Sequence, residues 1–456
     1  MKRFVFFGLA LFLALPLTAD AQEAAPTLEA GAAKRSIVPP FPTRMGGFFD
    51  RVTDFEGVSS PIHARALVCR SGGETVAVVT TDLVAVSKDL VIASREAIHG
   101  ELGIPTENIL ISATHSHSGP SGIERQLEYR GEFNEKLFTF LRDQIAEAVK
   151  EAHAGLTPAH VGFAYGELDG ITRNRQQNND LVDPQLGVLR LTETDGYTTI
   201  ATLINFTGHP VILGGGNLLL SSEYPGKASD TVEAVLGGIA LYTQGACGDV
   251  TMHRQGDPFK EVERLGTLVA GCVVETSMRI RPKADSRVLS QFEEVTVGLR
   301  EVPPVPEAEA RLEAAKAAAE KAKADGADER TVAKLLRAAD AAETTAMVAG
   351  WIEKNPDGMR DAANASAHVI QIGPMVSVGI PGELFVEYGL EMKRRIRETL
   401  DRPMILVGYA NGYIGYIVTP RAVFTGGYEQ AVARVDQHAG RLLTEAAMEA
   451  AANLVR

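Results

Sequence analysis

Short apolar runs alternate with polar turns from Ala32 to about Arg300, and amphipathic stretches lie between some of them. The apolar runs are rich in β-branched residues and predict strands at 75–86, 108–114, 186–193, 198–208 and 237–246. The amphipathic stretches predict helices at Lys88–His99, Asn134–Ala154 and Lys260–Met278. Strands and helices mixed in one continuous stretch indicate an α/β fold with a mixed β-sheet core and flanking helices.

From Pro303 to about Gly358 the pattern changes to one dominated by alanine, glutamate and lysine. This composition predicts two antiparallel helices with a break at 324–326. The segment contains no histidine and no cysteine, so we expect it to pack on the domain or project from it rather than to act in catalysis.

The α/β pattern returns after this segment. It predicts strands at 367–373, 375–380 and 404–419, a turn and helix at 381–400, and a final helix from about Glu429 to Leu454. We therefore predict one catalytic domain in two parts, 22–302 and 361–456, interrupted by a helical hairpin insertion at 303–360.

The N-terminus has the pattern of a signal peptide over residues 1–21. Lys2 and Arg3 precede an apolar run from Phe4 to Leu17, and a small-x-small cleavage site follows at 19–21. The run is shorter than the roughly 20 residues that span a bilayer. We expect an exported protein, periplasmic or secreted, with no transmembrane segment in the mature chain.

Charge and cysteine content narrow the class of protein further. The formal net charge of −13 argues against nucleic acid as a partner. Cys69, Cys247 and Cys272 are too few for a disulfide framework, although export would permit one bridge between two of them. Cys247 stands in a Gly-Ala-Cys-Gly segment, which is typical of a small buried residue rather than a nucleophile.

Three predicted strands end on residues that can bind a metal. His115 and His117 follow strand 108–114, and if the extended geometry continues, both rings lie on one side. His209 follows strand 198–208, and Glu383 begins the helix after strand 375–380. Two imidazoles and a carboxylate are the usual protein ligands of catalytic zinc. Alternatively, the histidines are simply polar residues that end strands, and Glu383 favours a helix N-terminus.

Other catalytic signatures are absent from the sequence, which has no G-x-S-x-G, P-loop or dinucleotide-binding motif. One longer segment, SATHSHSGPSG (112–122), closely resembles the S-A-T-H-T-H-S-G-P-G-G signature of the neutral/alkaline non-lysosomal ceramidases. The resemblance continues in order through TRNRQQNN (172–179), DPQLGVLRL (183–191), INFTGHP (204–210), SSEYPG (221–226), QGACGDV (244–250), IPGELF (380–385) and ANGYIGYIVT (410–419). It is specific for the family but not for the substrate.

The resemblance implies a zinc enzyme that cleaves the amide bond of ceramide. Its zinc ligands would be His115, His209, Glu383 and Tyr416. Tyr413 lies an odd number of residues from Tyr416 and would point to the opposite face of a strand.

One motif departs from the family. Family members have a catalytic serine in G-D-V-S-P-N, whereas this chain reads GDVTMH, with Thr251 at the serine position. We expect Thr251 to orient water or substrate, and His117 to stabilise the oxyanion or carry a proton to the leaving amine. Arg173 and Arg175 are expected to position the substrate.

These observations predict an exported hydrolase that uses Zn²⁺ to cleave the N-acyl amide of ceramide or a related lipid. Such a substrate implies peripheral contact with membrane lipid. Two alternatives remain open at this point: a zinc hydrolase of another ester or of a non-lipid amide, and a non-catalytic exported binding protein on the same fold.

Overall fold

The computed structural model of the chain describes residues 1, 27–48, 51–124, 132–354 and 363–454. Its largest element is an eight-stranded mixed sheet with the strand order β11-β9-β8-β6-β1-β3-β4-β5. The strands are β1 (Glu29–Ser36), β3 (His63–Ser71), β4 (Glu74–Thr81), β5 (Ile109–Ala113), β6 (Thr157–Glu167), β8 (Gln185–Glu193), β9 (Thr199–Phe206) and β11 (Ile239–Gln244). The α/β class with a mixed sheet, predicted from the sequence, is confirmed.

A second sheet has four strands in the order β13-β14-β15-β17. They are β13 (Val288–Thr296), β14 (Asn364–Ile372), β15 (Met375–Gly379) and β17 (Met404–Val407). Three two-stranded sheets pair β2 (Gly57–Val58) with β10 (Leu219–Leu220), β7 (Thr172–Asn174) with β12 (Val250–Met252), and β16 (Glu383–Leu384) with β18 (Tyr416–Ile417). The last two pairs carry candidate site residues.

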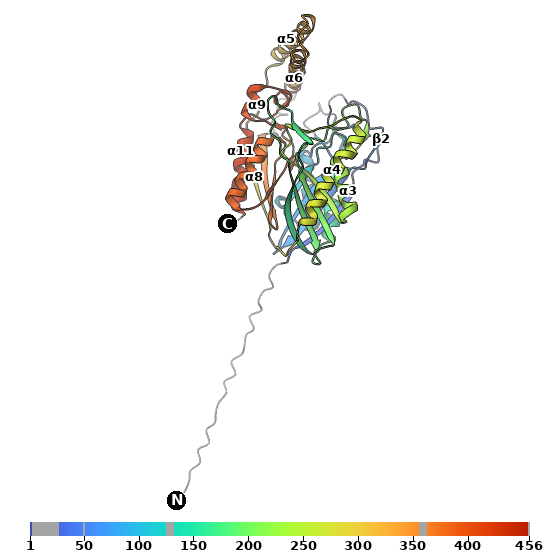
Figure 1. Cartoon of the computed structure of the whole chain (residues 1–456), viewed down its shortest axis with the longest axis vertical. Coiled ribbons are helices and arrows are strands. Elements are labelled where there is room, and N and C mark those ends of the chain that lie inside the picture. The colour runs from blue at the N-terminus through green and yellow to red at the C-terminus, as the bar shows by residue number, and fades with distance from the viewer. Residues whose placement is uncertain (2–26, 49–50, 125–131, 355–362, 455–456) are drawn as a thin grey trace.

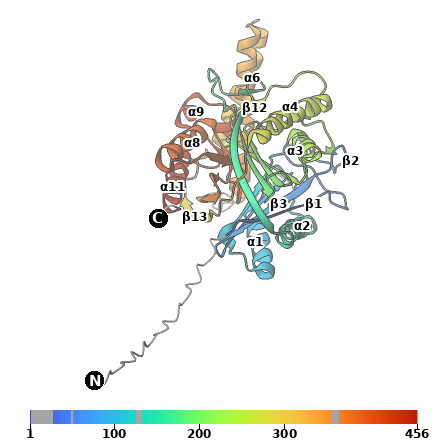
Figure 2. The same cartoon turned by 60° about the horizontal axis from the view of Figure 1, so that its bottom comes forward.

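Helices cover the outer faces of both sheets. The helices α1 (Lys88–Leu102) and α2 (Glu135–Ala154) pack on the β1-β3-β4-β5 half of the large sheet, as Figure 2 shows. The helices α3 (Glu223–Leu236) and α4 (Pro258–Arg279) pack on the half that contains β6, β8 and β11. The helices α8 (Val386–Leu400) and α11 (Ala439–Asn453) cover the second sheet on the opposite side of the molecule (Figure 1).

The inner faces of the two sheets share one hydrophobic core. Because side chains alternate along a strand, Ala66 and Val79 face α1 and α2, whereas Leu67 and Val78 face inward. The inward residues pack with Ile370 and other residues of the second sheet in one buried cluster. This shared core fixes the position of the second sheet, and with it the segments that carry the candidate ligands Glu383 and Tyr416.

The large sheet also bends back on itself. The strands β1 and β6 match at only two residue pairs, and β11 contacts β3, β4 and β5 although it lies at the other end of the strand order. At this contact the Gln244 Nε2 atom, at the end of β11, donates to the Thr114 carbonyl oxygen after β5 at 3.3 Å. The loops after β5, β9 and β11 therefore meet in one place.

Several predicted boundaries are wrong. The predicted strand 404–419 is two short strands, β17 and β18, separated by a turn in which Tyr409 and Asn411 have positive φ angles of 55° and 63°. The predicted C-terminal helix is two helices, α10 (Tyr428–Val432) and α11, and the strand predicted at 75–86 ends at Thr81. The helix α3 was not predicted. Local side-chain bonds and positive φ angles decide these boundaries, and a periodicity argument does not detect them.

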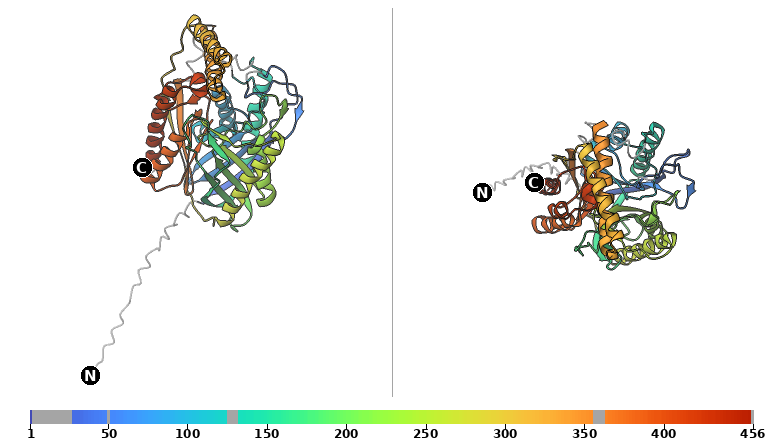
Figure 3. Two further views of the ribbon diagram at one scale, coloured as in Figure 1. Left: turned by 45° about the horizontal axis from the view of Figure 1, so that its top comes forward. Right: turned by 90° about the horizontal axis from the view of Figure 1, so that it is seen from above.

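The Ala-rich segment forms two helices, α5 (Val305–Ala324) and α6 (Glu329–Lys354), as predicted. The Lys316 ammonium and the Glu343 carboxylate join them at 3.2 Å. The pair projects beyond both sheets in Figure 1, and the view from above in Figure 3 shows it lying across the top of the fold. Two shorter elements are the helix α9 (Pro420–Thr425) and the 3-10 turn η1 (Thr106–Asn108).

The structure also bears on the predictions about cysteines and membrane-spanning segments. All three cysteines are free thiols. Among the described residues, no helix has both the length and the apolar character needed to cross a membrane. The signal peptide predicted at 1–21 lies outside the described residues apart from Met1.

Candidate metal and catalytic site

Three histidines meet at the point where the loops after β5 and β9 converge. The His115 Nε2 atom lies 2.8 Å from His209 Nε2 and 3.1 Å from His117 Nε2, and the last two atoms are 3.1 Å apart. The rings thus present three nitrogens to one small volume. The sequence predicted that His115 and His117 reach one object, and the structure brings them together.

The reason given for that convergence is wrong. The extended strand ends at Ala113, and His115 has a left-handed backbone with φ of 66°. A reversal at His115, rather than continued alternation, brings the two rings together. A non-glycine residue in this region costs on the order of 1–3 kcal/mol, and such residues cluster at functional sites.

A backbone carbonyl group holds each imidazole ring at its Nδ1 atom. The Nδ1 atom of His115 lies 2.6 Å from the Val84 oxygen, and that of His117 lies 2.9 Å from the Gly47 oxygen. The Nδ1 atom of His209 lies 3.2 Å from the Cys247 oxygen. Because a carbonyl oxygen only accepts, each Nδ1 carries the proton and each Nε2 presents a lone pair.

Three lone pairs at about 3 Å repel one another unless a cation lies between them. Burial lowers the pKa values of His117 and His209 well below the ordinary value, and the neighbouring His115 lowers them further. His117 and His209 therefore remain neutral, the form that binds metals. Imidazole rings whose far nitrogen donates to a carbonyl are the usual arrangement around a protein-bound metal.

Glu383 supplies a carboxylate to the same point. Its Oε2 atom lies 3.5 Å from His115 Nε2 and 3.9 Å from His209 Nε2, and it is buried with no hydrogen-bond partner among the described residues. Burial by itself would raise the pKa of Glu383, but the neighbouring His115, the Tyr413 hydroxyl and the Arg175 guanidinium lower the pKa below the usual value. A buried carboxylate oxygen without a donor, facing three imidazole nitrogens, fits a metal ligand.

Glu383 does not begin a helix, contrary to the prediction. It belongs to the short strand β16, and α8 begins three residues later at Val386. The strand β16 pairs in parallel with β18, where Glu383 is matched with Tyr416. This pairing, rather than a helix dipole, places the carboxylate beside the tyrosine.

The two tyrosines of the ANGYIGYIVT segment both face the site. The Tyr413 hydroxyl donates to Glu383 Oε1, so the expectation that Tyr413 points away from the site is wrong. The turn between β17 and β18 removes the strand alternation on which that expectation depended. The Tyr416 hydroxyl accepts from Arg175 Nη2 at 3.4 Å.

Arg175 is built into the site. Its Nε atom pairs with Glu429 at 3.1 Å, and its Nη2 atom donates to the Gly248 carbonyl oxygen as well as to Tyr416. Burial alone would lower the pKa of Arg175, but Tyr416 and Glu429 raise it above the usual value, so the guanidinium stays charged. Its positive charge favours the ionised forms of Glu383 and Tyr416.

Thr251 and Arg173 are placed differently. They are matched on neighbouring strands, β12 and β7, and a β-bridge joins Thr251 to His209. Thr251 is buried and Arg173 is exposed, and neither is among the described residues that line the cavity at the histidines. The structure thus brings Thr251 next to a candidate ligand but does not place Arg173 at the site.

A cavity of about 260 Å³ opens onto the histidines. His115, His117, Glu383 and Tyr416 form part of its lining. The apolar part of the lining is Met45, Phe48, Val52, Val84, Ala85, Pro120, Ile123, Val348 and Val432, joined by the rings of Tyr413 and Tyr428. The Phe48 ring packs edge-on against His117 with 5.2 Å between the ring centroids.

The helical insertion contributes to this wall, which sequence reasoning missed. Thr344 and Val348 of α6 line the cavity, and α6 packs against α10, which contributes Tyr428 and Val432. The two α6 residues are four positions apart, the spacing of one helix face. That spacing was the available signal, but nothing in the sequence said which face turns toward the site.

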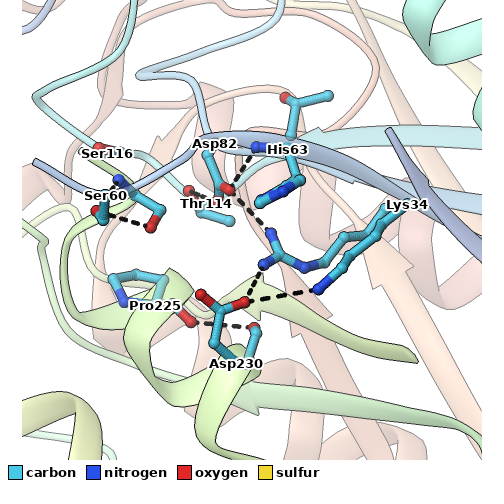
Figure 4. A network of polar contacts seen from close by, with 12 residues as sticks. Lys34, Ser60, His63, Asp82, Thr114, Ser116, Pro225 and Asp230 are labelled. Atoms are coloured by element: carbon cyan, nitrogen blue, oxygen red, sulfur yellow. Dashed lines mark hydrogen bonds and ion pairs between the residues drawn. The ribbon is translucent and has the colours of Figure 1, made fainter. Parts of the chain in front are cut away.

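A buried ionic network supports the residue before His115. The Asp82 carboxylate accepts from Arg65 Nη1 at 2.9 Å, from the His63 backbone N–H at 2.8 Å and from the Thr114 hydroxyl at 3.3 Å. Arg65 also pairs with Asp230 of α3 at 3.0 Å (Figure 4). The network ties the loop after β5 to β3 and α3.

Comparisons with known proteins identify the family of the chain. A family model described as neutral/alkaline non-lysosomal ceramidase, N-terminal, matches residues 30–258. The neutral ceramidase of Mycobacterium tuberculosis is 26% identical over 388 residues, which are 71% of this chain and 60% of that protein. The neutral ceramidase of Pseudomonas aeruginosa is 31% identical over 163 residues, which are 32% of this chain and 24% of that protein.

The fold is similar to that of a solved ceramidase. The crystal structure of the Pseudomonas aeruginosa neutral ceramidase matches with a TM-score of 0.75 at 18% identity, over 94% of this chain and 74% of that chain. A structure described as ceramidase complexed with C2 matches with a TM-score of 0.74 at 18% identity, over 94% of this chain and 75% of that one. The chain spans less than two thirds of the length of the curated relatives named above.

Proposed function

Because the chain belongs to the neutral/alkaline non-lysosomal ceramidase family, we propose that it is an exported zinc-dependent hydrolase of the N-acyl amide bond of ceramide or a related lipid. One observation carries the proposal: three imidazole Nε2 atoms and the Glu383 Oε2 atom face one point on the wall of a cavity. The relatives named as neutral ceramidases indicate the substrate class.

The chain offers a set of zinc ligands. His115, His209 and Glu383 would hold the ion, with Tyr416 beside Glu383 as the fourth group. His115 and His209 are each only 1% exposed, as suits residues that bind a metal from the protein side. When bound, zinc supplies Lewis acidity, which polarises a carbonyl group and acidifies water near neutral pH.

His117 fits a proton carrier. It is more exposed than the other two histidines, it lines the cavity, and its Nε2 atom is unprotonated because Nδ1 donates to Gly47. The Nε2 atom can take a proton from the attacking water and then give it to the leaving amine nitrogen when the C–N bond breaks. The products are a carboxylate and a free amine. In this tautomer Nε2 has no proton at the start of the reaction. His117 can therefore accept a proton from water but cannot yet donate a hydrogen bond to the oxyanion.

The walls of the cavity suit an apolar acyl or alkyl chain near the reacting bond. About 260 Å³ is slightly below the usual range for a ligand pocket, so the far ends of long chains would lie outside it. Val52 and Tyr428 line the cavity and are also 66% and 45% exposed, so they form its outer edge. An exposed apolar edge supports peripheral contact with membrane lipid, which co-sedimentation with phosphatidylcholine vesicles would test.

Two experiments test the proposal together. Purified protein should contain about one zinc per chain and should hydrolyse a short-chain fluorescent ceramide. The substitutions His115→Ala and His209→Ala should abolish both properties, whereas the exposed His438→Ala is the matched control. Zinc content that is unchanged in both site variants contradicts the metal assignment.

A second candidate function is hydrolysis of another ester or of a non-lipid amide. The small cavity and Thr251 at the family's serine position favour it. A zinc-loaded protein that ignores ceramide but cleaves other amides or esters in a broad screen would replace the first proposal with this one. A zinc-loaded protein without any hydrolysis would indicate a binding protein.

Export rests on the charged and apolar pattern of residues 1–21. Sequencing the N-terminus of protein recovered from the periplasm or the medium should give a chain that begins near Gln22. Protein that stays in the cytoplasm with residues 1–21 attached would contradict export.

A further inference from the structure

Glu223 is a buried acid in a strained backbone conformation. It is the first residue of α3, its exposed fraction is 0%, and its φ angle is 49°. A left-handed conformation at a non-glycine residue costs on the order of 1–3 kcal/mol. Burial raises the pKa of Glu223 to about 8, so the site also opposes the charged form. Both costs require compensation from what the carboxylate contacts.

The two carboxylate oxygens contact two different loops. Oε2 accepts from the Ile212 backbone N–H at 2.8 Å, in the loop that carries His209. Oε1 lies 3.3 Å from the hydroxyl of Ser118, the residue after His117. Glu223 therefore spans the two segments that present His117 and His209.

The direction of the serine bond is fixed by a third residue. Asn217 Oδ1 accepts from the Leu219 backbone N–H at 3.0 Å, so its Nδ2 group is the donor that faces Ser118 Oγ at 3.1 Å. The Ser118 oxygen thus receives one hydrogen and gives its own to Glu223. Both partners of Glu223 donate, so both of its oxygens act as acceptors.

The segment just before Glu223 clamps the same loop. The Ser116 hydroxyl donates to the Ser221 carbonyl oxygen at 2.7 Å, and the Ser221 backbone N–H donates to the Ser118 carbonyl oxygen at 2.9 Å. The strained start of α3 is what allows this segment to contact the His117 loop while the Glu223 side chain reaches toward Ile212.

We propose that Glu223 is a positioning residue for the metal site: it holds the loop that carries His115 and His117 at a fixed distance from the loop that carries His209, and so sets the affinity for zinc. This inference rests on the proposed function, because it assumes that the histidines bind zinc. It does not depend on the substrate. Partners that orient metal ligands typically change metal affinity by about 10- to 100-fold when they are mutated.

The test measures the zinc dissociation constant of the full chain by chelator competition, with no substrate present. Glu223→Gln keeps the shape but replaces one accepting oxygen with a donating NH2 group, and it should weaken zinc binding about 10- to 100-fold. Glu223→Gly relieves the left-handed strain but removes the bridge, and it should weaken zinc binding at least as much. A role confined to backbone strain predicts the opposite, namely unchanged binding in the glycine variant.

Glu261→Gln is the matched control. Glu261 is 5% exposed in α4, and its carboxylate accepts from the Gln255 backbone N–H at 2.9 Å and from Arg264, away from the histidines. It should bind zinc like the wild type. Ser118→Ala should also weaken zinc binding, and combining it with Glu223→Gln should add less than the sum of the two effects, because both remove one bond. A folded Ser118→Ala variant also keeps the test available if the Glu223 variants do not fold.

The outcomes separate this inference from the proposed function. If the wild type binds zinc and the Glu223 and Ser118 variants bind it equally well, the inference fails alone. If the wild type binds zinc but cleaves no ceramide, the ceramidase proposal fails and the positioning role stands or falls on the measured affinities. A wild type that binds no zinc overturns both.

Discussion

The role of His117 decides how the site works, and it can be tested directly. Its Nε2 atom is as close to His115 and His209 as a third ligand would be, at 3.1 Å from each. Its greater exposure and its place on the cavity wall favour a proton carrier instead. The substitution His117→Ala separates these roles. Removing a ligand should release the metal, whereas removing a proton carrier should leave the metal bound.

The expected size of the effect follows from the proton-transfer role. General acid–base catalysis typically contributes 10²- to 10⁴-fold, which corresponds to about 2.7–5.4 kcal/mol in the barrier. We therefore expect kcat of His117→Ala to fall by about that factor, with KM and zinc content close to those of the wild type. The Nδ1 bond to Gly47 shows that the native ring accepts at Nε2, so added imidazole should restore part of the rate.

The assay pairs zinc content with steady-state hydrolysis of a short-chain fluorescent ceramide. The comparison variants are His115→Ala, which should lose zinc, and His117→Gln, which keeps a polar side chain but cannot carry the proton. Zinc loss in His117→Ala as complete as in His115→Ala, with partial retention in His117→Gln, would refute the reasoning and make His117 the third imidazole ligand.

Four further predictions follow from residues around the site. Thr251→Ser should keep the rate of ceramide hydrolysis and Thr251→Ala should lower kcat about tenfold or more; equal rates would leave Thr251 a packing residue. Cys247→Ala should keep its activity, because burial raises the pKa of this thiol, and loss of activity with zinc and fold intact would contradict that. Val348→Trp should narrow the cavity and reduce kcat/KM for long acyl chains by about fourfold per excluded methylene, at about 0.8 kcal/mol each, whereas Met347→Trp on the exposed side should not. Arg65→Met leaves the buried Asp82 carboxylate without its guanidinium partner and should lower the free energy of unfolding by about 3–5 kcal/mol in urea melts.

The sequence could indicate the candidate ligand positions because each stands at the end of a recognisable apolar run. His115, His209 and Glu383 all follow such runs, and the resemblance around the H-x-H segment connected them. What the sequence could not provide is the way they meet. That depends on the bend of the large sheet and on the core it shares with the second sheet, which are long-range contacts.

Local backbone conformation accounts for several of the wrong predictions. His115 and Glu223 adopt left-handed conformations that no residue preference indicates, and both are held there by bonds to distant segments. The start of α3 also contains Pro225 and Gly226, which have low helix propensity, so the pattern did not predict that helix. Tyr413 was misplaced for a related reason, since a turn replaced the expected strand.

The position of the helical insertion has a consequence for how this protein could diversify. The strands β13 and β14 are antiparallel neighbours, and Thr296 is paired with Asn364, so the chain leaves the sheet and returns to it at adjacent points. Longer connections between adjacent ends cost little, since doubling a loop adds only about 0.6 kcal/mol of closure entropy. A segment at such a point can be lengthened, shortened or exchanged while the sheet register and the histidines stay as they are. Because α6 carries Val348 into the cavity wall, evolution or a protein engineer can change the shape of the cavity without changing the segments that carry the histidines.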